Sequence, residues 1–303
     1  MNTGKNIWTY TNKMKTIFVY ILSVFLITTS NCQIKSDVKT QKTIKLIISI
    51  NAFHNAKTED AHAIAEILAN HIKKSNKLEQ EFIVETPNTL DEIEKAAGDD
   101  FDCIILNTEE YIHLQKKLSL EPFTTNYTAG NVGFKYHLLV NKADNINDIS
   151  QLKNETIYIL AREYQKAPFL WLEKLLREKG LSNSKKFVKD IITDYKATNV
   201  VLPVFFNKAK ACIVTEASLN LLVELNPSIK TKMKILESSD FLLLGLGCLN
   251  KKKKDTDTYN TLKDIIFTLH ENEYGKQLLH LFNADKLVPY KDEYLQNYLK
   301  LVK

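Results

Sequence analysis

The chain is poor in glycine, and none of the common catalytic loops occurs in it. Its 8 glycines among 303 residues form neither a phosphate-binding loop nor the sharp turn that presents a nucleophilic serine. The 7 histidines show no metal-ligand spacing, because His62 and His71 on a predicted helix are nine positions apart rather than three or four. An enzyme would depend on isolated residues such as His54, and a single loop histidine is usually solvated. We therefore predict a protein without catalytic residues, metal or cofactor.

Arginine is scarce as well. Only Arg162 and Arg177 are arginines among 41 basic residues, so two-pronged recognition of a carboxylate or phosphate is available at two positions. The formal net charge of +5 is concentrated at the N-terminus, since removing Lys5, Lys13 and Lys15 from the 41 leaves 38 basic against 36 acidic residues. A nearly neutral body offers no electrostatic attraction for nucleic acid, and we predict no such partner.

Four cysteines are too few and too scattered for a disulfide framework. Cys103, Cys212 and Cys248 each lie inside an apolar run, and their number is odd. A free cysteine in such a run behaves as a small hydrophobic side chain. We expect three buried, inert thiols.

The apolar run near the N-terminus is too short to span a membrane. Ile17 to Ile27 cover eleven positions, about half of the ~20 that a spanning helix needs, which indicates a signal segment over residues 1–32 with its start at Met1 or Met14. The small and polar residues ending in Cys32 resemble a bacterial lipoprotein cleavage site and predict lipidation of Cys32. Ordinary secretion, with Cys32 removed, is the alternative. Residues 33–42 are polar and indicate a tether.

Two segments of the chain repeat one pattern. Residues 90–114 and 200–222 each run from an amphipathic helix through a turn into a buried strand that opens with a Cys-Ile pair, and then into another helix. Polar residues close the two strands: Asn107, Thr108 and Glu109 in one, Thr215 and Glu216 in the other. In open α/β sheets ligands bind at the carboxyl ends of strands. The repeat therefore predicts two lobes facing one cleft, and chance similarity of short segments is the alternative.

The remaining pattern alternates strands and helices. Predicted strands at residues 43–50, 81–86, 135–143 and 156–161 alternate with helical segments, which favours parallel sheets covered by helices. The segment from Leu120 to Gly133 is rich in Thr, Asn and Gly, and we expect it to cross between domains.

The order of these elements resembles a known family. YHLLVNK, ISQLKNETIYI, LLREKGL, VVLPVFFNKAKACIV and ILESSDF follow one another as in the phosphate/phosphonate-type periplasmic substrate-binding proteins of ABC importers. The resemblance implies an α/β fold of two lobes, each a mixed, mostly parallel sheet flanked by helices, joined by two crossovers. Residues 43–130 plus 234–303 would form lobe one, and residues 131–233 lobe two.

The same resemblance implies a function. The chain would be a membrane-tethered, extracytoplasmic solute-binding protein, a monomer that closes on a small polar or anionic ligand, phosphonate-like, phosphate-like or a carboxylate. Its partners would be that ligand, an ABC permease, and the membrane through its lipid anchor. A sensing or surface lipoprotein of the same fold is the alternative, and an enzyme on this fold is the third reading.

The site residues follow from the expected loops after the strands. Where phosphonate binders carry a turn rich in Ser, Thr and Gly, this chain has Arg162, Glu163, Tyr164 and Gln165, which argues against phosphonate itself. Arg162 could instead make an ion pair, and the Thr and Glu residues could cap helices. The predicted ligand-binding residues are Asn51, Phe53, Asn107, Thr108, Tyr111, Arg162, Tyr164, Thr198, Asn199, Thr215 and Glu216.

Overall fold

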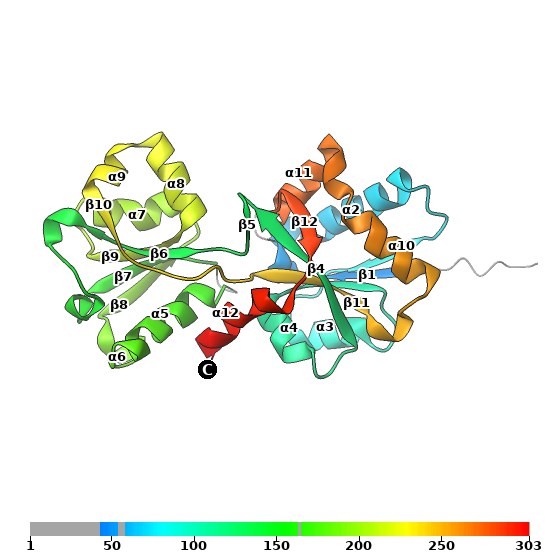
Figure 1. The fold of residues 1–303 in the computed structure, drawn as a ribbon, viewed down its shortest axis with the longest axis horizontal. Coiled ribbons are helices and arrows are strands. Elements are labelled where there is room, and N and C mark those ends of the chain that lie inside the picture. Colours follow the sequence, from blue (N-terminus) through cyan, green and yellow to red (C-terminus); the bar gives the residue numbers. More distant parts are fainter. Residues whose placement is uncertain (1–42, 54–57, 163–164, 303) are drawn as a thin grey trace, which may run out of the picture. The chain divides into compact units, whose positions relative to one another are not determined.

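A computed structural model describes residues 43–53, 58–162 and 165–302. The predicted signal segment, the tether, Cys32, His54 and Tyr164 lie outside the described residues. Within them the chain forms two β-sheets, each covered by helices on both faces (Figure 1). Short 3-10 turns connect several elements: Ile50–Ala52, Thr58–Asp60, Lys142–Asp144, Ile149–Leu152, Lys251–Lys253 and Leu269–Glu271.

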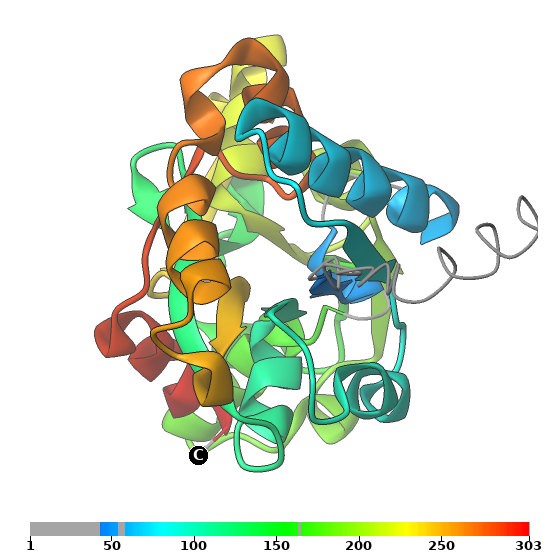
Figure 2. The same ribbon diagram turned by 90° about the vertical axis from the view of Figure 1, so that its right-hand side faces the viewer.

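The first sheet has seven strands, in the order β12-β4-β11-β3-β1-β2 with β5 paired to β4. Its strands are β1 (Ile44–Ile48), β2 (Phe82–Glu85), β3 (Cys103–Asn107), β4 (Leu120–Thr128), β5 (Asn131–Val132), β11 (Gly245–Asn250) and β12 (Lys286–Pro289). One face is covered by α2 (Ala61–Ser75), α10 (Asp257–Ile266) and α11 (Glu273–Leu281), and the other by α3 (Leu90–Ala97) and α4 (Thr108–Leu114) (Figure 2). We call this sheet with its helices the first lobe.

The second sheet has five strands, in the order β10-β6-β9-β7-β8. They are β6 (Tyr136–Asn141), β7 (Thr156–Leu160), β8 (Asp190–Asp194), β9 (Ala211–Thr215) and β10 (Met233–Ser238). Its helices are α5 (Ala167–Glu178) and α6 (Ser184–Phe187) on one face, and α7 (Ala197–Phe205), α8 (Glu216–Leu225) and α9 (Ser228–Lys232) on the other (Figure 1). This sheet with its helices is the second lobe. The C-terminal helix α12 (Asp292–Val302) contacts α5.

The two lobes share one topology. Five strands of the first sheet, β2-β1-β3-β11-β4, correspond in order and direction to β8-β7-β9-β6-β10 of the second. The repeated sequence pattern is α3-β3-α4 in one lobe and α7-β9-α8 in the other. The polar rims after β3 and β9 therefore hold equivalent positions in the two sheets.

Both sheets are mixed, and most of their strands run in one direction, as predicted. In the first sheet β1, β2, β3 and β4 run one way and β5, β11 and β12 the other, and in the second sheet β6 alone runs against the other four strands. β6 and β11 run against their neighbours β9 and β3 because each enters its sheet from the other lobe.

Two predicted boundaries differ from the observed pairing. β10 pairs with β6, so residues 234–238 belong with the second sheet and not with lobe one. The segment Leu120–Thr128, expected as a crossing, is the strand β4 instead. Threonine is a good strand former, and the hydroxyl of Thr125 donates to the carbonyl of Gly245 at 2.8 Å, which satisfies it inside the sheet.

The two crossing segments between the lobes are hydrogen-bonded to each other. The backbone N–H of Phe134 donates to the carbonyl of Leu242 at 2.9 Å, and the N–H of Leu242 donates back at 2.8 Å. Gly133 precedes this bridge with φ +85°, and a Cβ built on it would lie 2.4 Å from the carbonyl oxygen of Leu242. Only glycine fits here.

The three cysteines are buried, as predicted. Cys103 lies in β3, Cys212 in β9 and Cys248 in β11, all at 4% exposure or less. Burial raises the pKa of all three thiols, that of Cys103 to about 12. A protonated, buried thiol is a poor nucleophile, so these residues are inert packing groups.

Candidate ligand-binding site

The rim of the first lobe is organised by a buried carboxylate, Glu110. One of its oxygens accepts bonds from the Ser49 hydroxyl at 2.7 Å and the Asn51 side-chain amide at 2.8 Å. The other accepts the backbone N–H of Asn107 at 2.9 Å, while Asn107 caps α4 by accepting the N–H of Glu110. Burial raises the pKa of Glu110, and the bonds from Ser49 and Asn51 partly offset this. Glu110 thus fixes the loop after β1 against the start of α4.

A small polar cavity of about 20 Å³ lies at this rim. The second lobe contributes the start of α5 to its wall, and α12 contributes Tyr298. Its lining residues are Asn51, Asn107, Thr108, Glu109, Gln165, Lys166, Ala167, Leu244 and Tyr298. Glu109 accepts the Tyr298 hydroxyl at 2.6 Å and pairs with the Lys166 ammonium at 3.4 Å. The wall of this small cavity thus carries one negative group, the Glu109 carboxylate, and one positive group, the Lys166 ammonium.

A larger cavity of about 200 Å³ adjoins the small one, and Gln165 lines both. The carboxyl ends of β7, β8 and β9 surround it with Arg162, Tyr195 and Thr215, and Asn283 of the first lobe completes the wall. Among the lining residues that the structure describes, Arg162 alone carries a formal charge.

The contacts of Arg162 within the described residues are with uncharged groups. Its guanidinium carbon lies 5.6 Å from the ring centre of Tyr195, a cation–π distance. Its backbone N–H donates to the side chain of Gln165 at 3.0 Å, and its carbonyl accepts the Gln165 N–H. No ion pair joins Arg162 to a carboxylate within the described residues, so the alternative of an ion pair is not observed there.

Two hydroxyl groups lie at the end of the neighbouring strand β9 and in the first turn of α8. Thr215 caps α8, accepting the N–H of Ser218 at 3.2 Å and donating to the Ser218 hydroxyl at 2.8 Å. Both residues line the cavity. Positive charge, two hydroxyls and the aromatic rings of Phe134, Tyr136 and Tyr195 together suit a small anion with an apolar or planar part.

The structure brings together five of the predicted residues. Asn51, Asn107 and Thr108 line the small cavity, and Arg162 and Thr215 line the large one. Thr108 is 1% exposed, however, and its hydroxyl donates to the carbonyl of Leu243 at 2.7 Å. This bond connects the start of α4 to the crossing segment that contains Leu243, so the hydroxyl proton is not available to a ligand. Capping, foreseen as the alternative role of the Thr and Glu residues, applies to Thr215, and the cap of α4 is Asn107, which was predicted only as a ligand-binding residue.

Five other predicted residues lie away from both cavities. Phe53 is 2% exposed and packs on Phe282, with ring centres 4.6 Å apart, and Tyr111 is buried in the core. Thr198 is exposed in the first turn of α7, where Asn199 donates to Asp194 at 2.9 Å. Glu216 pairs with buried His137 at 3.5 Å, and burial lowers the pKa of that histidine.

Nine of the eleven described residues that line the large cavity were not predicted, and four of them are Gln165, Tyr195, Ser218 and Asn283. Gln165 was read only as part of a bulky turn, and Asn283 follows α11, far away in sequence. Tyr195 and Ser218 had usable signals. Tyr195 directly follows the strand β8, as the predicted rim residues follow their strands. Ser218 comes three residues after the cap Thr215, and residues three apart lie next to each other on a helix.

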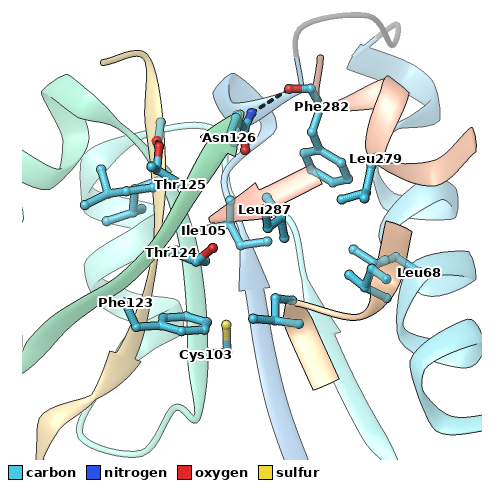
Figure 3. A pocket seen from close by; sticks show the side chains of 17 residues that line it. Leu68, Cys103, Ile105, Phe123, Thr124, Thr125, Asn126, Leu279, Phe282 and Leu287 are labelled. Carbon is cyan, nitrogen blue, oxygen red and sulfur yellow. Dashed lines mark hydrogen bonds between the residues drawn. The ribbon is translucent and has the colours of Figure 1, made fainter. Parts of the chain in front are cut away.

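A further cavity inside the first lobe has a different character. It measures about 40 Å³ and is lined almost wholly by apolar side chains of the sheet, α2, α10 and α11, including Leu68, Phe123 and Leu279 (Figure 3). Asn126 donates to the carbonyl of Phe282 at 2.7 Å at its edge. No charged group lines it. It is a packing void and not the ligand site.

The fold agrees with two-lobed binding proteins of known structure. A binding component of a phosphonate ABC transporter from Pseudomonas aeruginosa is 15% identical with a TM-score of 0.57, and 86% of each chain is covered. PhnD1 from Prochlorococcus marinus, in complex with methylphosphonate, is 14% identical with a TM-score of 0.59 over 86% of this chain and 97% of that one. A Xanthomonas citri protein bound to ATP reaches 0.61 at 12% identity over 86% and 96%. No curated protein matches the sequence.

Residues 52–295 match the family described as ABC transporter, phosphonate, periplasmic substrate-binding protein. The chain belongs to this family, and its role is to bind a ligand for an importer outside the cytoplasm. Nowhere in the described part of the chain is there a helix with the length and apolar character needed to cross a bilayer.

Proposed function

We propose that this protein is a lipid-anchored receptor that holds a small anionic solute in the large cavity and delivers it to an ABC permease. The observation that carries the proposal is the guanidinium of Arg162, which lines the large cavity at the carboxyl end of β7 and has no ion pair with any carboxylate of the described residues. A planar guanidinium donates two parallel bonds to a carboxylate or a phosphorus oxyanion, and such bonds are short and strong. The Ser218 hydroxyl, which accepts a bond from Thr215, supplies a hydroxyl donor nearby.

Closure on the ligand follows from the composition of the wall. Arg162 and Thr215 belong to the second lobe, and Asn283 to the first. A ligand that touches residues of both lobes binds the closed arrangement more tightly, and this difference alone shifts the equilibrium toward it. We place the hinge of this closure at the crossing segments around Phe134 and Leu242, since they are the only two chain connections between the sheets in the described residues.

A ligand screen tests this assignment. The mature chain would be heated with phosphonates, phosphate, carboxylates and amine metabolites, and at least one anion is expected to raise the melting temperature. A ligand at 100 times its dissociation constant adds about 2.7 kcal/mol to the free energy of unfolding. Stabilisation by uncharged or cationic compounds alone would contradict an anion site. Recovery of the bound ligand unchanged is also expected, because the described residues that line the large cavity include no histidine or carboxylate that could serve as a base.

The lipid anchor is a separate part of the proposal. Cys32 ends the signal segment and would carry the lipid, with residues 33–42 as tether. Replacing Cys32 with serine should move the protein from the membrane fraction to the soluble fraction and abolish labelling with radioactive palmitate. Unchanged fractionation of Cys32→Ser would mean that the chain is held at the membrane by something else or is secreted.

A further inference from the structure

The end of the second lobe that lies away from the cavities is strongly basic. Arg162 and Thr215 lie at the carboxyl ends of β7 and β9, and four loops lie at the opposite end of this sheet. We call these four loops the basic end: residues 142–155, 179–189, 206–210 and 226–232. They contain ten lysines and three carboxylates, a net charge of +7, whereas residues 33–303 as a whole have 38 basic and 36 acidic residues. Positive charge is therefore concentrated on this end.

The equivalent loops of the first lobe show no such excess. They precede or follow the corresponding strands of the first sheet: residues 76–81, 98–102, 115–119 and 251–256. They contain seven lysines and six carboxylates. Four of these lysines make ion pairs, among them Lys252 with Asp99 at 2.8 Å and Lys253 with Asp102 at 2.9 Å. Because the two lobes share one topology, the fold itself does not require the lysines of the basic end.

Most lysines of the basic end make no ion pair within the described residues. Nine of the ten are exposed. Only two of the ten are paired with a carboxylate in the part of the chain that the structure describes: Lys179 with Asp148 at 3.0 Å, and Lys210 with Asp144 at 2.6 Å. Lysine is a strongly hydrated point charge and lacks the planar fork with which arginine binds a single phosphate. Many separate point charges suit an extended anionic surface.

Exposed apolar side chains lie among these lysines. Phe206 and Leu225, at the ends of α7 and α8, are 60% and 74% exposed. The Phe206 ring packs edge-on against Phe205, with ring centres 5.0 Å apart, and the ammonium nitrogen of Lys232 lies 4.7 Å from the centre of the Phe205 ring. Lysines around exposed Phe and Leu side chains are typical of surfaces that bind a bilayer, because the charges meet anionic headgroups while the apolar groups enter the acyl boundary.

We infer that the basic end binds the surface of a membrane that contains anionic lipid, with Phe206 and Leu225 inserted between the headgroups. A membrane is the anionic surface within reach, because the protein binds its ligand for an importer outside the cytoplasm. A nucleic acid would attract the lysines but would offer no apolar layer to Phe206 and Leu225. The contact leaves the cavities accessible, since they lie at the other end of the strands. The inference goes beyond the proposed function and needs neither the ligand nor the lipid anchor.

Sedimentation with vesicles tests the membrane contact. The chain from residue 33 to residue 303 contains both sheets with all their helices and lacks Cys32, so it carries no lipid there. It would be mixed with vesicles of phosphatidylcholine alone, or of phosphatidylcholine and phosphatidylglycerol in equal parts. The partition coefficient should be about a hundredfold higher for the anionic vesicles in about 0.1 M salt. It should fall steeply toward 1 M salt, because the Debye length shortens from about 10 Å to about 3 Å.

Neutralising one loop locates the contact on the protein. Lys185, Lys186 and Lys189 are exposed and make no ion pair within the described residues. Replacing all three with glutamine should lower the partition coefficient about a hundredfold, because one lysine near an anionic surface contributes about fivefold. Phe206→Ala should lower it about tenfold, although the charge stays the same, because the apolar ring no longer leaves water.

Lysines of the first lobe supply the matched control. The triple change Lys251→Gln, Lys252→Gln and Lys254→Gln removes the same charge from the equivalent end of the other lobe. It should alter the partition coefficient by less than about twofold, because charges farther from the membrane than the Debye length of about 10 Å are screened. Melting curves and circular dichroism would establish that every variant is folded.

The outcomes decide between a membrane and other anionic partners. Equal partition into both kinds of vesicle, or equal losses in the two triple variants, would overturn the contact at the basic end. An unchanged partition coefficient for Phe206→Ala would overturn the insertion, and tighter binding to double-stranded DNA than to anionic vesicles would overturn lipid as the partner. None of the replaced residues lines either cavity of the ligand site, so failure of the membrane contact leaves the proposed function standing.

Discussion

Replacing Arg162 with alanine is expected to weaken binding of the screened anion about ten- to a hundredfold. Among the described residues that line the large cavity, only Arg162 is formally charged, and a hydrogen bond to a charged group contributes about 1.5–3 kcal/mol. Stability should change little, because its ring partner Tyr195 is 63% exposed and the cation–π contact is therefore weak. Calorimetric titration measures the loss, and thermal unfolding measures the stability.

Two controls sharpen this result. Arg162→Lys keeps the charge but loses the planar fork, so it should recover part of the affinity. Arg177→Ala removes the other arginine of the chain, which is exposed near the end of α5, and should leave binding unchanged. Full affinity in a folded Arg162→Ala variant would contradict the anion site at this position.

Replacing Gly133 with alanine is expected to lower the free energy of unfolding by about 2–5 kcal/mol. A left-handed conformation costs a residue with a side chain about 1–2 kcal/mol, and forcing atoms into a filled space costs about 1–3 kcal/mol more. The clash is with the backbone of Leu242, which cannot turn aside as a flexible side chain would. Urea unfolding monitored by circular dichroism measures the difference.

Gly130→Ala separates the two contributions. Gly130 has φ +86°, nearly the same as Gly133, but a Cβ there would meet nothing within 4 Å. Its loss should be limited to the conformational part, about 1–2 kcal/mol. If the two variants lose similar amounts of unfolding free energy, the crossing segments can move apart to admit a Cβ at residue 133, and the steric contribution would be contradicted. Ligand affinity is expected to fall for Gly133→Ala only, because this change alone displaces the connection on which closure depends.

Local patterns were enough to predict most of the fold. The Cys-Ile pairs marked β3 and β9 because apolar runs with polar ends are typical of central strands, and Asn107 and Thr215 marked the starts of α4 and α8 because they cap them. The partner of β10 was missed, since pairing with β6 depends on contacts across about a hundred residues of sequence. The role of β4 was missed because threonine-rich segments are common in both strands and loops.

The site was predictable in outline and less so in detail. Rims at strand ends located Arg162, Asn51, Asn107 and Thr215. Whether a rim residue faces the cavity or the core depends on tertiary packing. Phe53 and Tyr111 face the core for this reason. Glu110 and Tyr298 were missed because buried polar groups resemble surface residues in a sequence, and only their hydrogen bonds reveal them.

In the sequence, the strands of the second sheet are inserted between strands of the first, and this has a consequence for the order of folding. All strands of the second sheet lie between residues 136 and 238, whereas the first sheet needs β11 between β3 and β4, and β11 begins at Gly245. The second lobe can complete the hydrogen bonding of its sheet from one continuous stretch of chain. The first lobe can do so only after the C-terminal part of the chain that contains β11 has been synthesised. Late, long-range pairing slows folding and leaves strand edges open meanwhile. The edges of β3 and β4 are thus where a premature contact with another chain would begin.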